Sequence, residues 1–384
     1  MRVLNVISDS NIGGAGLVLI NYLKYADREK FAHTVAVPAG SMLLERLDGI
    51  GIDTVEISGI GERSLSLKSI VALRRLIKAL KADVVHTHAN LSARIAARLY
   101  GQCAVVYTRH SAFDLKPHST AFPMRQITGA INNALADVII AVSPAALANL
   151  VDTGADPRKI FTMFNGVEPV RRLDGRERRA VRESLGIKSG EFVCSIIARL
   201  EEVKGHRYVL EAAKLLDDLP IRVIIAGTGS AEAELRARAA ELGLTQCVFT
   251  GFVADTSGIE NITDLQLNAS FGTETSSLSL LEGMSLGTPA VVSDYGGNPH
   301  LITNGENGLV VPKKDARALA DAVRALYNNS ALLAGMSQKA HDAYISRFTA
   351  ERMAADIEDV YEAACALRRG EKTNLFARGK SDGQ

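Results

Sequence analysis

Short apolar runs alternate with amphipathic stretches over most of the chain. In the first part, the apolar runs occupy residues 3–7, 34–37, 84–86, 105–108 and 138–142. Runs of this length that are rich in Val and Ile, separated by stretches with helical periodicity, are typical of βαβ units and a parallel sheet. The first part of the chain therefore predicts an α/β domain.

A second series of the same kind follows a pause in the pattern. The pause lies near residues 165–169, and an arginine-rich stretch covers residues 171–182. New apolar runs then occupy residues 192–197, 222–226, 247–249, 265–267 and 290–292, without an internal repeat of fixed period. We interpret the pause as a hinge between an N-terminal domain, residues 1–168, and a C-terminal domain, residues 169–349.

Helical patterns close the chain. They cover residues 316–327, 330–347 and 350–367. We expect the last helix, at residues 350–368, to pack back onto the N-terminal domain. The tail, residues 369–384, is polar and contains glycine. Chain ends of this kind are often disordered, so we predict a disordered tail.

Composition and charge narrow the class of protein. A length of 384 residues suits two domains that each bury a full core. A hydrophobic content of 47% with 23% charged residues is typical of a folded globular protein. The net charge of +1 does not favour nucleic acid as a partner. The four cysteines are far apart, which disfavours a metal site or a disulfide framework and favours core positions in a reducing compartment; they are Cys103, Cys194, Cys247 and Cys365.

Membrane contact is left open by the sequence. The apolar run at the N-terminus is too short for a signal peptide, and no run approaches about 20 apolar residues, so we expect a cytoplasmic protein without a membrane span. A helical pattern at residues 66–82 sets Lys and Arg against an apolar face. Such a helix can lie on an anionic membrane at its inner face, or it can simply cover the sheet.

A glycine loop follows the first strand. Gly13 and Gly14 lie in residues 8–16, where missing Cβ atoms let the backbone approach a ligand. The loop lacks both the dinucleotide fingerprint and the lysine of a P-loop, so a nicotinamide enzyme and a nucleoside triphosphatase lose support. A plain tight turn remains the alternative.

A histidine follows the strand at residues 105–108. His110 can hydrogen-bond a sugar hydroxyl or stabilise charge in a transition state. A purely structural role is the alternative for His110, and also for His86 and His88, which lie at the strand that starts at Val84.

Two cations follow the first strand of the second series. Arg199 and Lys204 are five residues apart, and two cations converging on one spot suit a diphosphate. Fixed cations stabilise the negative charge of a departing nucleotide diphosphate, as a metal ion otherwise does. The chain contains no Asp-x-Asp, the spacing that metal-dependent sugar transfer commonly uses. Two solvated surface charges are the alternative.

Two glutamates frame the start of a predicted helix. Glu274 lies in the loop before the helix and Glu282 lies inside it, which disfavours an acid and base on either side of one bond. The first can contact a sugar and the second a ribose. The unpaired N–H groups of the helix start can face phosphates. We therefore expect both glutamates to hold a nucleotide-sugar donor.

These motifs, in this order, resemble glycosyltransferase family 4, a group of retaining enzymes with the GT-B fold, over nearly the whole chain. The glycine loop, His110, the Arg199 and Lys204 pair and the two glutamates carry the resemblance. Further matches are Asn165-Gly166-Val167, Ala226-Gly227-Thr228-Gly229, Gly251-Phe252-Val253, Gly287-Thr288-Pro289 and Ser293-Asp294-Tyr295-Gly296-Gly297.

The resemblance implies an α/β fold of GT-B type, with two Rossmann-like, doubly wound parallel-sheet domains facing a central cleft. It implies transfer of a hexose or N-acetylhexosamine, with retention, from a nucleotide diphosphate sugar to a glycan, a lipid-linked or a small-molecule acceptor. A UDP-sugar is favoured, and neither a cofactor nor a metal is expected. Within the family pattern, Arg199 and Lys204 hold the diphosphate, Glu282 the ribose and Glu274 the transferred sugar.

The implied site covers both domains. The implied catalytic residues are His110, Arg199, Lys204 and Glu274. The implied donor-binding residues are Gly13, Gly14, Arg199, Lys204, Gly227, Phe252, Val253, Thr275, Ser276, Ser277, Leu278 and Glu282, with no metal ligand. In this pattern the backbone at Phe252 and Val253 meets the base, and His110 lies beside the donor sugar.

Three positions depart from the family pattern. Thr275-Ser276-Ser277 replaces the usual Gly-Phe-Gly, His300 replaces a frequent carboxylate, and Ala198 replaces a common glycine. These departures keep two alternatives open: a sugar-nucleotide epimerase of the same fold and a catalytically silent sugar-nucleotide-binding protein. Base, sugar, acceptor, linkage and oligomeric state are not specified by the sequence.

Overall fold

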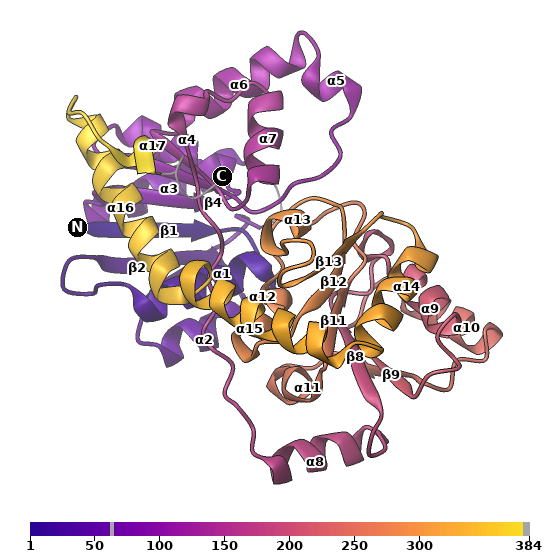
Figure 1. Cartoon of the computed structure of the whole chain (residues 1–384). Coiled ribbons are helices and arrows are strands. Elements are labelled where there is room, and N and C mark those ends of the chain that lie inside the picture. The colour runs from indigo at the N-terminus through magenta and orange to yellow at the C-terminus, as the bar shows by residue number, and fades with distance from the viewer. Residues whose placement is uncertain (62–64, 379–384) are drawn as a thin grey trace. The chain divides into compact units, whose positions relative to one another are not determined.

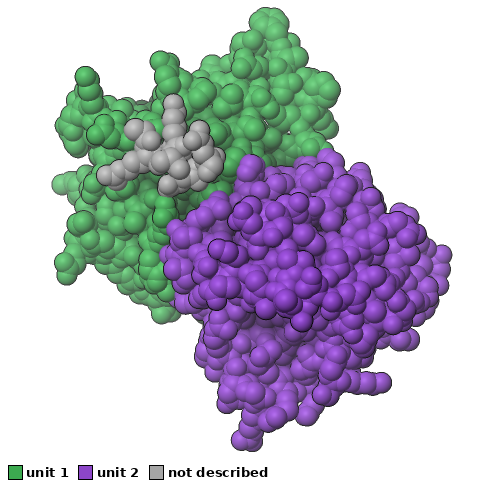
Figure 2. All heavy atoms as spheres, in the orientation of Figure 1, with its two compact units in different colours: residues 1–166, 350–384 green, residues 167–349 purple. Residues whose placement is uncertain are grey.

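The computed structural model describes residues 1–61 and 65–378. The chain divides into two compact units: unit 1 comprises residues 1–166 and 350–384, and unit 2 comprises residues 167–349 (Figure 2). The division between residues 166 and 167 lies two residues before the expected hinge boundary, because Val167 already pairs with residues near the end of unit 2: its N–H donates to the carbonyl of Phe348.

Unit 1 is built on a sheet of seven parallel strands in the order β3-β2-β1-β4-β5-β6-β7. The strands are β1 (Arg2–Ile7), β2 (Ala32–Pro38), β3 (Asp53–Ile57), β4 (Val84–His88), β5 (Ala104–Arg109), β6 (Val138–Ala141) and β7 (Ile160–Thr162). Its helices are α1 (Gly14–Tyr25), α2 (Leu43–Gly49), α3 (Leu67–Leu80), α4 (Leu91–Tyr100), α5 (Pro117–Thr120), α6 (Met124–Leu135), α7 (Pro144–Asp152), α16 (Ala350–Arg368) and α17 (Leu375–Arg378).

The two faces of the unit 1 sheet differ in chemistry. Alternate strand residues such as Val6, Val85 and Val105 form an apolar core with α3 and α4. Asn5 and His86, whose neighbours in the strands belong to that core, contact Tyr361 of α16 instead. Helix α16 packs against α1 and β5 (Figure 1).

Unit 2 is built on a sheet of six parallel strands in the order β10-β9-β8-β11-β12-β13. The strands are β8 (Phe192–Ile197), β9 (Ile221–Ala226), β10 (Cys247–Gly251), β11 (Leu265–Asn268), β12 (Ala290–Ser293) and β13 (Gly308–Val311). Its helices are α8 (Gly175–Ser184), α9 (His206–Lys214), α10 (Glu232–Glu241), α11 (Ser257–Ile262), α12 (Leu278–Leu286), α13 (Asn298–Leu301), α14 (Ala316–Tyr327) and α15 (Ser330–Arg347).

Both sheets have the strand order of a doubly wound fold. The order reverses between β1 and β4 in unit 1, and between β8 and β11 in unit 2. In such sheets a ligand binds outside the carboxyl ends of the strands, at the point where the order reverses. The loops after β1, β4, β8 and β11 are therefore the ones to search for chemistry.

Three strands and part of the tail differ from what the sequence predicts. The apolar runs do not predict β3, β7 or β13, which are short or mixed in polarity. In the tail, residues 375–378 form α17 and Leu375 is buried, where we expected disorder; residues 379–384 lie outside the described residues. All four cysteines are free thiols.

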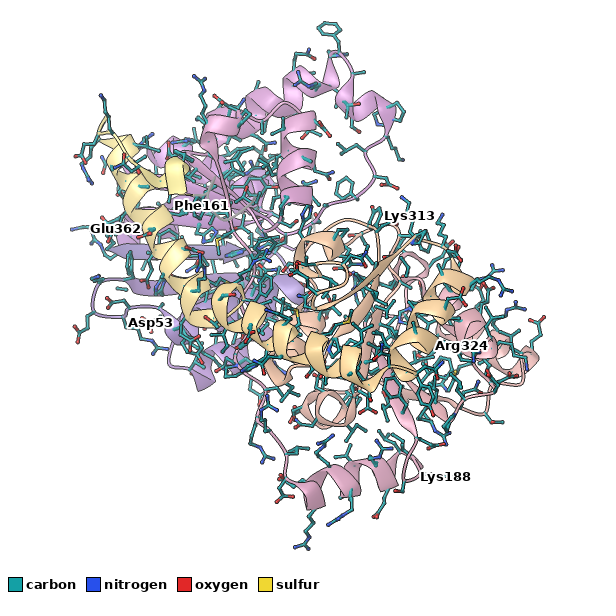
Figure 3. The ribbon with its side chains drawn as sticks, in the orientation of Figure 1. Asp53, Phe161, Lys188, Lys313, Arg324 and Glu362 are labelled. Atoms are coloured by element: carbon teal, nitrogen blue, oxygen red, sulfur yellow. The ribbon has the colours of Figure 1, made fainter. Side chains whose placement is uncertain are left out.

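Charged side chains lie on the surface of each unit. In unit 2, Arg324 of α14, which is labelled in Figure 3, pairs with Asp218 at 2.7 Å. Solvent-exposed pairs of this kind contribute little to stability. Within residues 1–61 and 65–378, no helix has both the length and the apolar character needed to cross a membrane.

Candidate functional site

A buried ion pair lies where the strand order of unit 2 reverses. Lys204, in a 3-10 turn (Glu202–Lys204) after β8, donates from Nζ to Oε2 of Glu274 at 2.9 Å and to the carbonyl of Thr273 at 3.1 Å. Glu274 follows β11 and is only 7% exposed. An ammonium group has three N–H donors, and these two contacts use two of them. The pair can therefore also hold an anion.

Two residues that the sequence analysis did not single out fix Glu274. Asn268 Nδ2 and Ser270 Oγ donate to the same Oε2 oxygen, at 3.1 and 3.0 Å. Asn298 in turn donates to Asn268 Oδ1 at 3.3 Å. The signal in the sequence is the polar residues at and just after the end of β11, Asn268 and Ser270.

Glycines allow the loops of this site to approach one another. Gly205 has a φ of +73°, and a Cβ atom there would collide with the carbonyl of Ala269. A Cβ on Gly296 or Gly297 would collide with the backbone of Glu274 or Thr275. The Gly297 N–H donates to the Glu274 carbonyl at 3.2 Å. The Gly296-Gly297 pair is therefore needed to seat the backbone of the first glutamate.

The start of α12 offers hydrogen-bond donors. The helix begins at Leu278, and Ser277 is its N-cap residue without a side-chain capping bond. Ser279 Oγ donates to the carbonyl of Ile197 at 3.0 Å. Ser276 is buried, and its hydroxyl has no hydrogen-bond partner among the described residues. A helix start with a spare hydroxyl is suited to bind a phosphate group.

Glu282 lies in the second turn of α12 and is half-buried. Burial, together with the nearby Asp255, raises the pKa of its carboxyl to about 7, although a hydrogen bond from Thr256 opposes the shift. Glu260 of α11 is fully buried, and burial followed by repulsion from Glu282 raises its pKa well above the usual range. The carboxyl of Glu282 is therefore shielded from solvent and lies near two other acidic residues, Asp255 and Glu260.

Arg199 lies in the loop after β8 and is exposed. Lys204, five residues farther along the chain, contacts Glu274. A Cβ on Gly227 would collide with the carbonyl of Ala198, and the Leu200 N–H donates to the Thr228 carbonyl at 2.9 Å. The Gly227 loop thus packs directly on the Arg199 loop, and a larger side chain at position 227 would separate them.

The segment that we expect to contact the nucleotide base, residues 251–253, lies at the end of β10 and directly after it. Gly251 has a φ of +70°, and its carbonyl accepts from the Gly227 N–H at 2.8 Å. Phe252 is 69% exposed, whereas Val253 packs against the core of unit 2.

The glycine loop of unit 1 begins helix α1. Gly13 is the N-cap of α1, and a Cβ there would collide with the carboxylate of Asp9. A Cβ on Gly14 would meet only open space. The Asp9 side chain can rotate away, so packing does not require glycine at position 13, and Gly14 leaves room beside the helix start.

His110 follows β5 and is linked to a second histidine. Its Nε2 lies 2.8 Å from Nδ1 of His88, the last residue of β4. Burial lowers the pKa of His110 to about 4 although part of its surface is exposed. Both imidazoles are therefore neutral near pH 7, since burial also holds the pKa of His88 well below its usual value.

The structure shows the contacts of the three positions that depart from the family pattern. His300 in α13 is exposed, and its carbonyl accepts from Arg347 at 3.1 Å. Ala198 donates its N–H to the Ala226 carbonyl at 3.0 Å. Both contacts are made by backbone atoms of His300 and Ala198, so they do not depend on which side chain stands at either position. The Thr275-Ser276-Ser277 segment supplies the spare hydroxyl described above.

Two family models cover most of the chain. Residues 12–171 match the model described as Glycosyltransferase Family 4. Residues 177–343 match the model described as Glycosyl transferases group 1. The first match includes Gly13, Gly14 and His110, and the second includes Arg199, Lys204 and both glutamates.

Similar proteins span most of this chain. A D-inositol 3-phosphate glycosyltransferase of Acidothermus cellulolyticus is 30% identical over 321 residues, which cover 77% of this chain and 70% of the relative. A UDP-Gal:alpha-D-GlcNAc-diphosphoundecaprenol alpha-1,3-galactosyltransferase of Escherichia coli is 27% identical over 307 residues, covering 77% and 79%.

A solved structure shares the fold. HepE of Anabaena, crystallised with UDP, superposes with a TM-score of 0.82 at 21% identity, covering 94% of this chain and 100% of that chain. The two parallel sheets, the two family models and these relatives agree. The chain belongs to glycosyltransferase family 4, has the GT-B fold, and is a glycosyltransferase.

Proposed function

We propose that the protein transfers a hexose or N-acetylhexosamine from a UDP-sugar to a cell-envelope glycan, a lipid-linked or a small-molecule acceptor. The observation that carries the proposal is the buried Lys204–Glu274 pair beside the start of α12. Lys204 holds the diphosphate, the α12 start and Ser276 donate to it, and Glu274 binds the sugar. UDP is favoured because HepE was crystallised with UDP and with UDP-glucose, and the Escherichia coli relative uses UDP-Gal.

The proposal includes retention at the anomeric carbon. The bond from that carbon to the leaving phosphate breaks, and the acceptor oxygen bonds to the carbon on the same face. The leaving phosphate takes the proton of the acceptor hydroxyl, so no covalent enzyme intermediate forms. Lys204, Arg199 and the α12 start stabilise the charge that develops on the phosphate. The anomeric proton coupling of the product, measured by NMR, tests retention.

A donor and product screen tests the proposed function. UDP-, GDP- and ADP-sugars are titrated by calorimetry, and the tightest binder is incubated with and without acceptors. We expect a UDP-sugar to bind best and to release UDP only when an acceptor is present. Conversion of the sugar nucleotide without an acceptor would instead support an epimerase. Binding without turnover across a broad acceptor panel would support a silent binding protein.

We expect chelators to leave the rate of transfer almost unchanged. In the proposed mechanism, cationic side chains and a helix start perform the charge stabilisation that a divalent ion performs elsewhere. The measurement is the initial rate with and without excess EDTA, followed by addition of Mg²⁺ or Mn²⁺ to the treated enzyme. A large loss of rate that either metal restores would contradict this part of the proposal.

Donor affinity should depend on pH through Glu282. Its pKa is raised to about 7, so the carboxyl is mainly protonated at pH 6 and mainly ionised at pH 8. A carboxylate accepts stronger hydrogen bonds from ribose hydroxyls than a neutral acid does. We therefore expect the Kd of a UDP-sugar to fall several-fold from pH 6 to pH 8, and to become flat in Glu282→Gln. Calorimetry at both pH values checks this, and an equal slope in the variant would contradict the assignment.

An exposed apolar ridge in unit 1 favours peripheral contact with an anionic membrane. Residues 121–127 are all exposed, and Phe122 is 83% exposed. Met124, Ile127 and Ile131 share one face of α6 and are exposed as well. In α3, Leu67 and Val71 are exposed in a helix that carries only cations among its charged residues. Apolar side chains beside cations are typical of helices at a membrane surface.

Vesicle binding tests this contact. Phe122→Ser combined with Ile127→Ser should reduce co-sedimentation with vesicles that contain phosphatidylglycerol by at least about 10-fold, because two exposed apolar side chains no longer enter the bilayer. Ile345→Ser is the matched control, because Ile345 is an exposed isoleucine of unit 2. Equal loss in the control, or no binding by the wild type, would contradict the contact.

A further inference from the structure

The two carboxylate oxygens of Glu274 have different surroundings within unit 2. Oε2 accepts from Lys204 Nζ at 2.9 Å, from Asn268 Nδ2 at 3.1 Å and from Ser270 Oγ at 3.0 Å. Oε1 accepts no hydrogen bond from any residue that the structure describes, and it is not enclosed. Oε1 is therefore the oxygen that a ligand can meet.

The amide of Asn268 can lie only one way round. A carboxylate accepts hydrogen bonds, whereas a backbone N–H donates them. Asn268 Nδ2 therefore faces Glu274, and Asn268 Oδ1 accepts from the Ser270 N–H at 3.1 Å. Rotation of the amide by half a turn would point its oxygen at the carboxylate. In that orientation Asn268 would no longer hold Glu274.

Asn298 of α13 holds this arrangement from behind. Its side chain is fully buried, and Nδ2 donates to Asn268 Oδ1 at 3.3 Å and to Ser293 Oγ at 3.1 Å. Ser293, the last residue of β12, donates in turn to the carbonyl of Ser270. Hydrogen bonds therefore run from Asn298 to Glu274 by two routes, one through the end of β11 and one through the end of β12.

The fold alone does not account for an amide at position 298. Asn298 Oδ1 is buried without a hydrogen-bond partner among the described residues, and such an acceptor lowers stability. A leucine would fill a similar volume without this cost. It would leave no other group unpaired, because Asn268 Oδ1 would still accept from the Ser270 N–H. The amide of Asn298 therefore requires an explanation other than packing.

We propose that Asn298 is a positioning residue for sugar transfer. It holds the donors of Asn268 and Ser270 against Oε2 of Glu274, which leaves Oε1 in a fixed position to accept from a hydroxyl of the transferred sugar. Groups that are oriented before the substrate binds need no reorganisation in the transition state. The sugar in this inference rests on the proposed function, whereas the route of hydrogen bonds does not.

Asn298→Leu tests the role, because it removes both donated bonds and orphans no buried group. We expect kcat to fall about 10- to 100-fold, since a misplacement of about 1 Å can cost a factor of 100. The unfolding temperature should equal or exceed that of the wild type, and the affinity for UDP should not change. In the Glu274→Gln background the same substitution should change kcat by less than about twofold, because Asn298 acts only through Glu274.

Asn261→Leu is the matched control. Asn261 is a buried asparagine of unit 2 whose Nδ2 donates to the carbonyls of Arg171 and Ser257, and whose Oδ1 accepts from the Leu173 N–H at 2.8 Å. We expect a lower unfolding temperature, because that N–H loses its acceptor, and an unchanged kcat. Equal loss of kcat in the two variants, or a wild-type kcat in Asn298→Leu, would overturn the positioning role.

NMR of the protein labelled with ¹⁵N-asparagine tests the route of hydrogen bonds without turnover. The Asn268→Ser spectrum assigns the side-chain N–H signals of Asn268. We expect these signals to shift in Asn298→Leu and to keep their wild-type positions in Asn261→Leu. Unchanged signals in Asn298→Leu would overturn the proposal, whatever the activity. If the signals shift as expected but no sugar nucleotide is turned over, the orientation of Glu274 by Asn298 stands and the failure belongs to the proposed function.

Discussion

Lys204→Ala should reduce kcat by about 10³-fold, since loss of a single preorganised donor to a developing anion costs a factor of this order. Two of the three N–H donors of Lys204 are bound by Glu274 and Thr273, at 2.9 and 3.1 Å. The third donor can hold a phosphate oxygen of the donor substrate. Because the ammonium is fixed before substrate binds, it stabilises the leaving diphosphate without reorganisation.

The same substitution should also lower stability. It leaves the buried Glu274 carboxylate with Asn268 and Ser270 but without its cation, at a cost of about 1–3 kcal/mol. Thermal unfolding measured beside the rate separates the two effects. Lys214→Ala is the control, because Lys214 pairs with Asp217 on the exposed surface of the same unit. A folded Lys204→Ala variant with a rate within a few-fold of the wild type would contradict the proposed role.

Glu274→Gln should reduce kcat by about 100-fold or more while leaving the affinity for UDP nearly unchanged. The amide has the shape of the carboxylate, so the fold is preserved, but the charge that balances Lys204 and binds the sugar is lost. Because UDP carries no sugar, its binding depends on Lys204 and the α12 start. Calorimetry with UDP and with the UDP-sugar, together with initial rates, distinguishes the two contributions.

The two variants should therefore differ in which ligand affinity they lower. Lys204→Ala should lower the affinity for UDP and the affinity for the UDP-sugar by a similar factor. Glu274→Gln should lower only the additional affinity that the UDP-sugar has over UDP. Glu211→Gln is the control for the second variant, because Glu211 pairs with Arg207 on the surface. A Glu274→Gln variant that loses affinity for UDP as strongly as Lys204→Ala would show that Glu274 acts through the diphosphate.

Much of the fold was predictable because the strands of parallel sheets are buried on both faces. Such strands appear as continuous apolar runs, and the run at residues 192–197 coincides with β8 (Phe192–Ile197). Strand β3 (Asp53–Ile57) was missed because an edge strand carries polar residues, here Asp53 and Glu56. Strand β7 (Ile160–Thr162) is too short to give a pattern.

The candidate site was predictable in its motifs but not in its contacts. The motifs place Lys204 and Glu274 in loops after strands, and only the structure shows that these strands, β8 and β11, are neighbours in the sheet. The roles of Asn268 and Ser270 were not predictable, because they depend on how the loop after β11 folds over the strand end. The His88–His110 bond depends on the register of β4 and β5, which the sequence does not specify.

Burial gives Glu282 a property that the sequence does not indicate. Helix α11 packs against α12, and Glu260 lies close enough to Glu282 for the two carboxyls to repel each other. Helical periodicity places Glu282 on a face but does not show what packs against that face. The expected pH dependence of donor binding therefore follows from the burial of Glu282 in the structure, and the sequence motif alone does not predict it.

The central claim is that the Lys204–Glu274 site transfers a sugar from a UDP-sugar to an acceptor. Its most direct test is the release of UDP from a panel of UDP-hexoses and UDP-N-acetylhexosamines, in the presence of lipid-linked and soluble saccharide acceptors, by the wild type and by Lys204→Ala. The account predicts acceptor-dependent release from at least one donor by the wild type, and a loss of about 10³-fold in the variant. Release at the same rate by both proteins would contradict it, as would binding of a UDP-sugar without release for every acceptor.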